Sequence, residues 1–316
     1  MILVCGEALV DLFILGQKGP RLAAEAVAGG SPYNVAIGLA RLGCPAAFCG
    51  GLSTDRFGEL LTAQLEAEGV GLDRAVRKSE LTTISVVATD PHGVPIYSFH
   101  GEGAADRSIT AADIAPPLPD AIEAITIGSY SLGVEPSGSA FYALASREST
   151  QRVVSLDPNV RPTVIGDPRA YGKKLARFLD TATIVKASEE DIELLYGKGA
   201  VIDDVARAWM DAGPRLVVVT LGARGAVAWS GGERVEVPGR KVAVVDTVGA
   251  GDTFHAALLA SLRSTGNLTA AALARLGRQA LGRALQYAVA AAAVTCSRRG
   301  ADMPRAHEVE ALLETT

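Results

Sequence analysis

The segment with the clearest chemical potential is Asp246–Phe254, which reads DTVGAGDTF and precedes an apolar run to Leu262. Its two glycines and an alanine allow the backbone to turn tightly and to approach a ligand closely. A helix that begins in this segment would direct its free amide groups and the positive end of its dipole toward the loop. Such a loop suits an anion, and in particular a phosphoryl group during transfer.

Asp252 adds a carboxylate to this loop. An aspartate beside a phosphate site can accept the proton of an attacking hydroxyl. Aspartate is also common as a helix N-cap, where its carboxylate only accepts backbone hydrogen bonds. The spacing alone leaves both roles open.

A second unusual segment is Gly29–Asn34, which reads GGSPYN. The two glycines would let a ligand touch the main chain, and Asn34 offers both donors and acceptors. Ser31 is placed to act as the N-cap of a helix with Pro32 at its first position. Taken alone, the segment is more typical of a tight turn between a strand and a helix with a solvent-facing Asn34.

The elements that would position these segments follow from the hydrophobic pattern. Apolar runs separated by amphipathic stretches predict a parallel, doubly wound sheet that is covered on both faces. The expected buried strands are Ile2–Cys5, Ala124–Ile127, Val153–Leu156, Thr183–Val185, Leu216–Leu221 and Val242–Val245. The expected helices are 31–42, Asp55–Glu68, Ser139–Glu148, Pro168–Leu179, Ile202–Ala212, Ala250–Ser264 and Thr269–Val294.

Shorter strands in the first hundred residues predict a small β appendage. They are Asp11–Leu15, Leu22–Val27, Thr83–Thr89 and Val94–His100, and a turn at Asp90–Gly93 joins the last two. The composition contains no linker or internal repeat. We therefore expect one α/β domain over residues 1–316 with this appendage attached.

Composition narrows the class of protein. The 316 residues are 48% hydrophobic and 21% charged, and 30 basic against 35 acidic side chains give a net charge of -5. Because the basic residues are not clustered, we expect no nucleic-acid partner. The four cysteines form no CxxC pair, and neither a signal peptide nor a membrane span is visible, which favours the cytoplasm. The P-loop and dinucleotide-binding glycine motifs are absent from the sequence.

Several segments together resemble the ribokinase/PfkB family of carbohydrate kinases, and bacterial fructokinases most of all. Gly29–Ala36 is similar to the N-terminal signature of the family, and Asp246–Phe254 is similar to the C-terminal one. Asp157–Arg161, Lys186–Asp191 and Thr220–Gly225 continue the likeness, which covers essentially the whole chain. The resemblance implies a ribokinase-like, three-layer fold with a mostly parallel sheet and a small β-sheet lid formed from segments about 11–28 and 82–107.

The resemblance also implies an ATP-dependent phosphorylation of a sugar hydroxyl, with Mg²⁺ as cofactor and with K⁺ as an additional cation that many relatives bind. The catalytic positions that match are Asp252 as base and Gly249, Ala250 and Gly251 as the anion hole. The sugar positions that match are Asp11, Gly30 and Asn34. Arg161 would serve the phosphates or a substrate carboxylate, with a structural ion pair as the alternative. The ATP positions that match are Ser188, Thr220, Gly222 and Gly225. The metal positions that match are Asp191 for Mg²⁺ and Asp246 for K⁺, although Asp246 could equally be a turn residue.

Two departures from the family pattern bear on the nucleotide. Ser188 and Asp191 stand where many relatives have Asn and Glu, an exchange that keeps a polar group and a carboxylate. Val289 stands where several relatives place an asparagine near the adenine, so recognition of the base could be looser.

Fructose, giving fructose 6-phosphate, is the first choice of substrate because the sugar-binding segment has no nearby lysine to hold a sugar phosphate. The alternatives are 2-keto-3-deoxygluconate, then ribose or a nucleoside, with Arg107 as a further candidate contact from the lid. A sugar sensor without turnover is the non-enzymatic alternative, and ADP release would distinguish the two. A homodimer through the lid is also expected, because lid strands have open edges.

Overall fold

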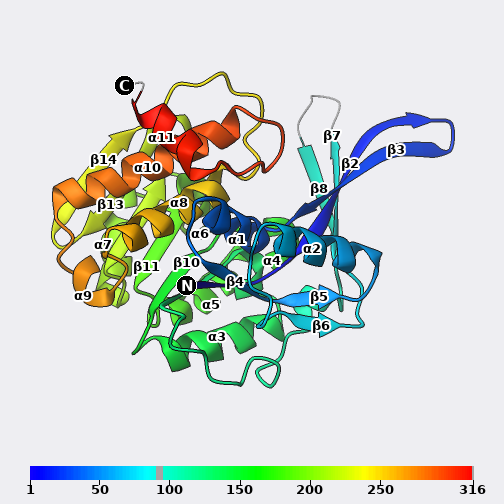
Figure 1. Ribbon diagram of the computed structural model, residues 1–316, viewed down its shortest axis with the longest axis horizontal. Helices are drawn as coiled ribbons and strands as arrows, with labels where there is room; N and C mark the ends of the chain where they lie inside the picture. The colour runs from blue at the N-terminus through cyan, green and yellow to red at the C-terminus, as the bar shows by residue number, and fades with distance from the viewer. Residues whose placement is uncertain (90–94, 315–316) are drawn as a thin grey trace.

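The computed structural model describes residues 1–89 and 95–314, and its centre is an eight-stranded sheet (Figure 1). The strand order is β14-β13-β12-β11-β10-β9-β1-β4. The strands are β1 Ile2–Cys5, β4 Ala46–Cys49, β9 Ala124–Gly128, β10 Val153–Asp157, β11 Ile184–Ser188, β12 Leu216–Thr220, β13 Gly225–Ser230 and β14 Glu233–Pro238. Neighbours are parallel except that β13 runs antiparallel to both β12 and β14. The predicted mostly parallel sheet is confirmed.

Helices cover both faces of this sheet, because successive residues of a buried strand point to opposite sides. Ile2 and Val4 of β1 join a core with one group of helices, whereas Leu3 and Cys5 join a core with the other. The first group is α1 Ser31–Arg41, α2 Arg56–Ala67, α8 Ala250–Ser264, α10 Arg278–Cys296 and α11 Ala306–Glu314. The second is α3 Ser137–Glu148, α5 Pro168–Leu179, α6 Glu189–Tyr196 and α7 Ile202–Ala212. The short helices α4 Pro162–Ile165 and α9 Ala270–Leu273 lie in connections.

A separate four-stranded sheet, which we call the lid sheet, has the order β3-β2-β7-β8. Its strands are β2 Leu9–Lys18, β3 Arg21–Gly29, β7 Ile84–Thr89 and β8 Pro95–His100. The β2–β3 hairpin projects well beyond the body of the protein (Figure 1). Both predicted lid segments contribute to this sheet, and the turn predicted at Asp90–Gly93 lies outside the described residues. A pair of short parallel strands, β5 Gly51–Ser53 and β6 Val76–Lys78, completes the β structure that the model describes.

Two predicted elements differ from the structure. The helix expected over Thr269–Val294 is divided into α9 and α10, with Gly277 as the N-cap of α10. The strand expected at Val242–Val245 is an irregular segment whose last two valine side chains are 65% and 64% exposed. A run of valines favours a strand, but only tertiary context provides the neighbour that it must pair with.

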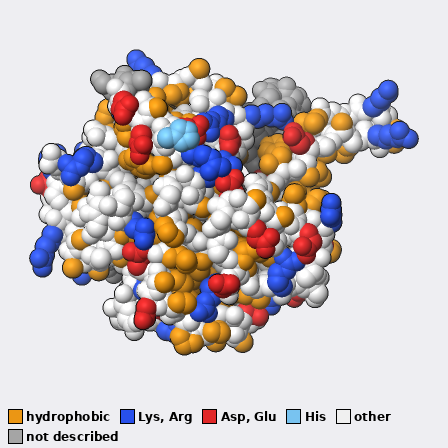
Figure 2. Space-filling model, in the orientation of Figure 1, with side chains coloured by type: hydrophobic (Ala, Val, Ile, Leu, Met, Phe, Trp, Pro, Cys, Tyr) orange, Lys and Arg blue, Asp and Glu red, His pale blue; other side chains and the backbone are white. Residues whose placement is uncertain are grey.

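The surface carries both signs of charge. Figure 2 shows acidic and basic side chains interspersed over the face that it views, with basic side chains at the tip of the β2–β3 hairpin, where Lys18 and Arg21 flank the turn. Among the described residues, no helix is long and apolar enough to cross a membrane.

Candidate active site

The predicted site forms where the N-terminal ends of α1 and α8 meet. The two helices pack closely because α1 carries Gly38, where a Cβ atom would lie only 2.9 Å from the Cβ of Ala256 in α8. Polar residues at the carboxyl ends of β10, β11 and β12 complete the site. The carboxyl ends of parallel strands are the usual location for ligands in open α/β sheets.

Asp252 is 8% exposed and lies in the first turn of α8. One of its carboxylate oxygens accepts a 2.6 Å hydrogen bond from Ser31 Oγ, and the other accepts a 2.8 Å bond from Asn34 Nδ2. The N-cap of α8 is Gly249, so the alternative role of Asp252 as a cap is wrong. Ser31 is likewise the first residue of α1 rather than its cap, and its hydroxyl serves Asp252 instead.

Burial raises the pKa of Asp252 above its ordinary value. The hydrogen bonds from Ser31 and Asn34 favour the ionised form and offset part of that rise. The carboxylate is therefore held as a desolvated base whose two oxygens are both oriented by α1.

The loop before α8 and the first turn of this helix leave three amides available to an anion. Gly249 has φ 76, a left-handed conformation that favours glycine, and the Ala250 amide donates to Thr247 O at 3.2 Å. The amides of Gly249, Gly251 and Asp252 have no acceptor among the described residues. A Cβ atom on Gly251 would meet only the Nζ atom of Lys186, at 3.3 Å. Among the described residues, three of the four amides of the predicted anion hole are thus free, and the amide of Ala250 is not.

Lys186 is the residue of this site that sequence reasoning did not assign. It is 3% exposed and forms a 2.8 Å ion pair with Asp157 of the neighbouring strand. Burial alone would lower the pKa of Lys186, but the carboxylates around it raise its pKa above the ordinary value, so the ammonium is charged. A single charged residue inside the otherwise apolar run of β11 was the available signal.

On the lid side, Asp11 lies near the start of β2 and pairs in register with Ser85 of β7. Burial raises the pKa of Asp11, Ser85 and Arg161 lower it, and the charge of Asp252 raises it further. Asp11 and Asp252 are therefore close enough to interact electrostatically. Gly30 has φ 108, and a Cβ atom there would lie 2.9 Å from the Glu7 carbonyl, so a side chain would not fit.

Arg161 is the N-cap residue of α4, and its guanidinium donates to the carbonyls of Asn159 and Val160, at 3.5 and 3.3 Å. Within the part of the chain that the structure describes, the hydrogen bonds of this guanidinium are to carbonyls and none is to a carboxylate. The alternative role as a structural ion pair is therefore not observed.

The nucleotide positions lie at the ends of adjacent strands. Ser188 of β11 is paired in register with Thr220 of β12. The loop that follows β12 turns through Gly222, with φ 57, and Gly225, with φ 105, into β13. A Cβ atom on Gly225 would lie 2.1 Å from Val237 O, so the turn requires glycine. Val289 is buried in the core of α10 and is 7% exposed.

The two predicted metal positions have their oxygens engaged. Asp191 accepts from Val160 N at 2.7 Å and from the main chain and hydroxyl of Ser188, with which it forms a capping box. Asp246 accepts from Val248 N at 3.1 Å and Gly300 N at 2.8 Å, as a turn residue would. In the described ranges, no group of three His, Cys, Asp or Glu side chains could hold a metal ion. The site therefore fits a Mg²⁺ ion carried by phosphates and water, not one caged by the protein.

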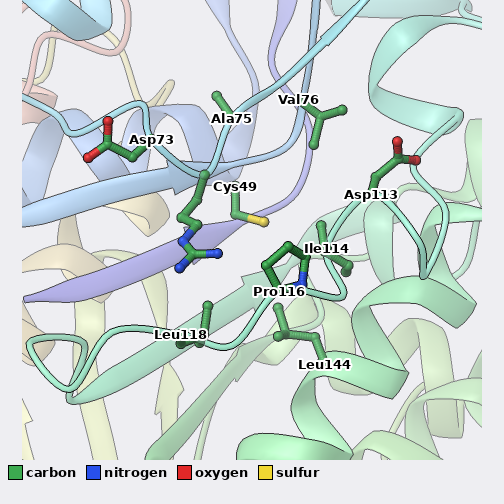
Figure 3. A pocket seen from close by; sticks show the side chains of 10 residues that line it. Cys49, Asp73, Ala75, Val76, Asp113, Ile114, Pro116, Leu118 and Leu144 are labelled. Carbon is green, nitrogen blue, oxygen red and sulfur yellow. The ribbon is translucent and has the colours of Figure 1, made fainter.

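A pocket of about 110 Å³ elsewhere on the molecule contains none of the predicted site residues (Figure 3). It is lined by Cys49, Asp73, Arg74, Ala75, Val76, Asp113, Ile114, Pro116, Leu118 and Leu144. Its walls mix both signs of charge with apolar groups, so nothing in it favours one ligand.

Comparisons with known proteins find similarity along most of the chain. The family model described as pfkB family carbohydrate kinase matches residues 1–307. The chain is 42% identical over 285 residues to a fructokinase of Rhizobium leguminosarum bv. trifolii, covering 89% of this chain and 85% of that protein. It is similar to the fructokinase of Xylella fastidiosa solved with bound ATP, with TM-score 0.90, 30% identity and coverage of 99% and 98%. It is also similar to a fructokinase variant of Vibrio cholerae O395 solved with fructose, ADP and a potassium ion, with TM-score 0.84, 28% identity and coverage of 99% and 97%.

Proposed function

Because this chain belongs to the pfkB family of carbohydrate kinases, we propose that it transfers the γ-phosphoryl group of ATP to fructose and forms fructose 6-phosphate. The observation that carries the proposal is the buried carboxylate of Asp252, oriented by Ser31 and Asn34 beside two free helix amides. A base and an anion site at one helix terminus are what phosphoryl transfer to a hydroxyl requires.

In this proposal Asp252 accepts the proton of the sugar hydroxyl while that oxygen forms a bond to the γ-phosphorus and the bond to the ADP oxygen breaks. The amides of Gly251 and Asp252 and the ammonium of Lys186 hold the charge on the transferred group. Bound Mg²⁺ would supply further neutralisation of the phosphates. Ser188 and Asp191 would reach that ion through water, since their direct contacts are within the protein.

On the sugar side, Asp11, Asn34 and the main chain at Gly30 would hydrogen-bond neighbouring hydroxyls. The lid sheet, in segments about 11–28 and 82–107, would close over the sugar and exclude water, so that the phosphoryl group is not lost to hydrolysis. Thr220, Gly222 and Gly225 would border the nucleotide, and Arg161 would serve its phosphates.

One observation favours the second candidate, 2-keto-3-deoxygluconate. Arg107 lies over the ring of Tyr130, and its Nε and Nη2 atoms are buried without a hydrogen-bond partner among the described residues. A guanidinium edge with two free donors matches a carboxylate. Fructose has no carboxylate. A preference for the keto acid would therefore identify the guanidinium of Arg107 as the group that binds the substrate carboxylate.

The deciding experiment measures ADP release with Mg²⁺ and ATP over fructose, 2-keto-3-deoxygluconate, ribose, adenosine and fructose 6-phosphate. We expect fructose to give the highest kcat/KM, and Asp252→Asn to lower kcat by roughly 10²–10⁴-fold, the usual contribution of a general base. Sugar binding without ADP release by the wild type would support the sensor alternative and refute the kinase.

We also propose that K⁺ binds beside the anion hole near Asp246, as support for the loop that Asp246 joins to Gly300. A potassium ion is bound in the Vibrio cholerae structure. We expect K⁺ to raise kcat in the wild type but not in Asp246→Ala. Equal rates in K⁺, Na⁺ and a bulky organic cation would exclude the site.

For the assembly, we propose a homodimer through the lid sheet. Strand β3 is an open edge, and Leu15 and Leu22 on its hairpin are each 60% exposed. Light scattering should give twice the chain mass for the wild type and one chain mass for Leu22→Glu. A monomeric wild type would exclude the dimer. The four unbonded thiols suit the reducing cytoplasm, where we propose that the protein resides.

A further inference from the structure

Beneath the anion hole lies a buried histidine that the proposed reaction does not use. His255 is one turn beyond Asp252 in α8 and is 1% exposed. Its Nε2 atom lies 2.8 Å from the hydroxyl of Ser155 in β10. Its Nδ1 atom lies 3.5 Å from Asp157 Oδ2, yet neither Nδ1 nor Asp157 Oδ1 has a hydrogen-bond partner among the described residues. Buried polar atoms are normally hydrogen-bonded, so the unpartnered Nδ1 atom of His255 requires an explanation.

Asp157 is shared between two groups. Its Oδ2 atom accepts a 2.8 Å hydrogen bond from Lys186 Nζ and also faces the imidazole of His255. Burial alone would raise the pKa of Asp157, but Lys186 and His255 lower its pKa below the ordinary value. The carboxylate is therefore ionised, and its orientation decides where the ammonium of Lys186 lies.

The surroundings of the ring select its tautomer. An ionised carboxylate can only accept hydrogen bonds, whereas a serine hydroxyl can donate or accept. A neutral His255 is thus satisfied best with its proton on Nδ1, facing Asp157, and with Nε2 accepting from Ser155. In this tautomer the N–H group at Nδ1 faces the carboxylate across 3.5 Å.

A cavity of about 10 Å³ lies beside this cluster. Its walls include Ser31, Asp157 and His255, and Ser31 is the donor to Asp252. The space is about that of one water molecule, and the unpartnered atoms of Asp157 and His255 belong to two of the residues that line it. The cavity therefore lies between this cluster and Ser31, the residue that donates to Asp252.

We propose that His255 is a positioning residue for phosphoryl transfer. Its Nδ1 edge holds the Asp157 carboxylate, which in turn fixes the Lys186 ammonium 3.3 Å from the position that a Cβ atom on Gly251 would occupy. Lysine is a flexible point charge with three donors, and only one is used by Asp157, so its aim depends on this support. The inference rests on the proposed function, because it assigns the charge of Lys186 to the transferred group.

Two substitutions test the Nδ1 and Nε2 atoms of the ring separately. His255→Asn keeps an amide near the position of Nδ1, and His255→Gln keeps one near the position of Nε2. We expect His255→Gln to lower kcat by roughly 10–100-fold, the usual effect of losing an outer-layer partner, with KM for fructose little changed. His255→Asn should retain more of the wild-type kcat than His255→Gln does.

A binding measurement supplies a readout that is independent of turnover. The complex of MgADP with aluminium fluoride mimics the transferred phosphoryl group, so calorimetry in the presence of fructose should show weaker binding of this complex to His255→Gln by about tenfold or more. Binding of ADP alone should be equal in both proteins. Thermal unfolding of each variant records any loss of stability.

The outcomes distinguish the possibilities. If His255→Gln matches the wild type in kcat and in binding of the aluminium fluoride complex, the inference is wrong. If both variants lose kcat in proportion to their loss of thermal stability, His255 is structural and the inference is also wrong. A wild type that releases no ADP with any sugar would overturn the proposed function, and the inference with it.

Discussion

Ser31 offers a sensitive test of the base, because its hydroxyl donates to Asp252 Oδ1 over only 2.6 Å. A hydrogen bond to a charged group contributes about 1.5–3 kcal/mol, and one pKa unit corresponds to about 1.4 kcal/mol. Ser31→Ala removes a donor that favours the ionised carboxylate. The pKa of Asp252, which burial already raises, should therefore rise further by about one unit, since water can replace part of the lost bond.

The assay is the pH dependence of kcat/KM for fructose in the acidic range. Because the base works only when ionised, the rate is lost as the pH falls through the pKa of Asp252. The acid limb of Ser31→Ala should lie about one pH unit above that of the wild type. Ser230→Ala is the control for loss of a buried serine hydroxyl, since the hydroxyl of Ser230 donates to Leu273 O, away from the site. An acid limb that stays in place, or that moves to lower pH, would refute the assignment of Asp252 as the base.

Three further predictions concern glycine and a helix cap. Gly251→Ala should fold normally but lower kcat, because the new methyl group meets only the Lys186 ammonium and enters the phosphate space. A kcat equal to that of the wild type would contradict the assignment of this space to the phosphoryl group. Gly249→Ala should instead lower the unfolding temperature, since its φ is 76 and its Cβ would lie 2.6 Å from that of Ala301; an unchanged melting curve would contradict this. Asp55 caps α2, and although burial acts to raise its pKa, hydrogen bonds from Gly58 and Thr82 lower it. Asp55→Ala should cost about 1 kcal/mol in denaturant unfolding at neutral pH. That difference should vanish as the pH falls through the lowered pKa of the folded state, and a constant difference would exclude the ionised cap.

The parts of the fold that sequence reasoning predicted are those set by local pattern. The limits of α8 were correct at Ala250–Ser264, because a glycine turn precedes a continuous apolar stretch. The division at Gly277 was missed, since alanine-rich sequence on both sides favours helix and only packing places the break. The irregular path of Val242–Val245 likewise depends on partners that are distant in sequence.

In the site, the residues of the two signatures came together as the resemblance implies. The hydrogen bonds and ion pairs that join the residues of the site were not predictable from spacing in the sequence. Ser31 reads as an N-cap in sequence, but the close packing of α1 on α8 gives its hydroxyl to Asp252. The ion pair of Asp157 with Lys186 forms because β10 and β11 are neighbours in the sheet. The order of strands in a sheet is not indicated by any local sequence pattern.

The close approach of Gly38 to Ala256 has a consequence for how such a site can vary. Asp252 belongs to α8, whereas both of its hydrogen-bond donors, Ser31 and Asn34, belong to α1. The affinity of Asp252 for a proton therefore depends on the separation of these two helices, which are held apart by little more than the methyl group of Ala256. A bulkier side chain at that crossing, one helical turn from Asn34 and Asp252, would push the two helices apart and would change the reactivity of the carboxylate without replacing any group that is proposed to contact sugar or nucleotide.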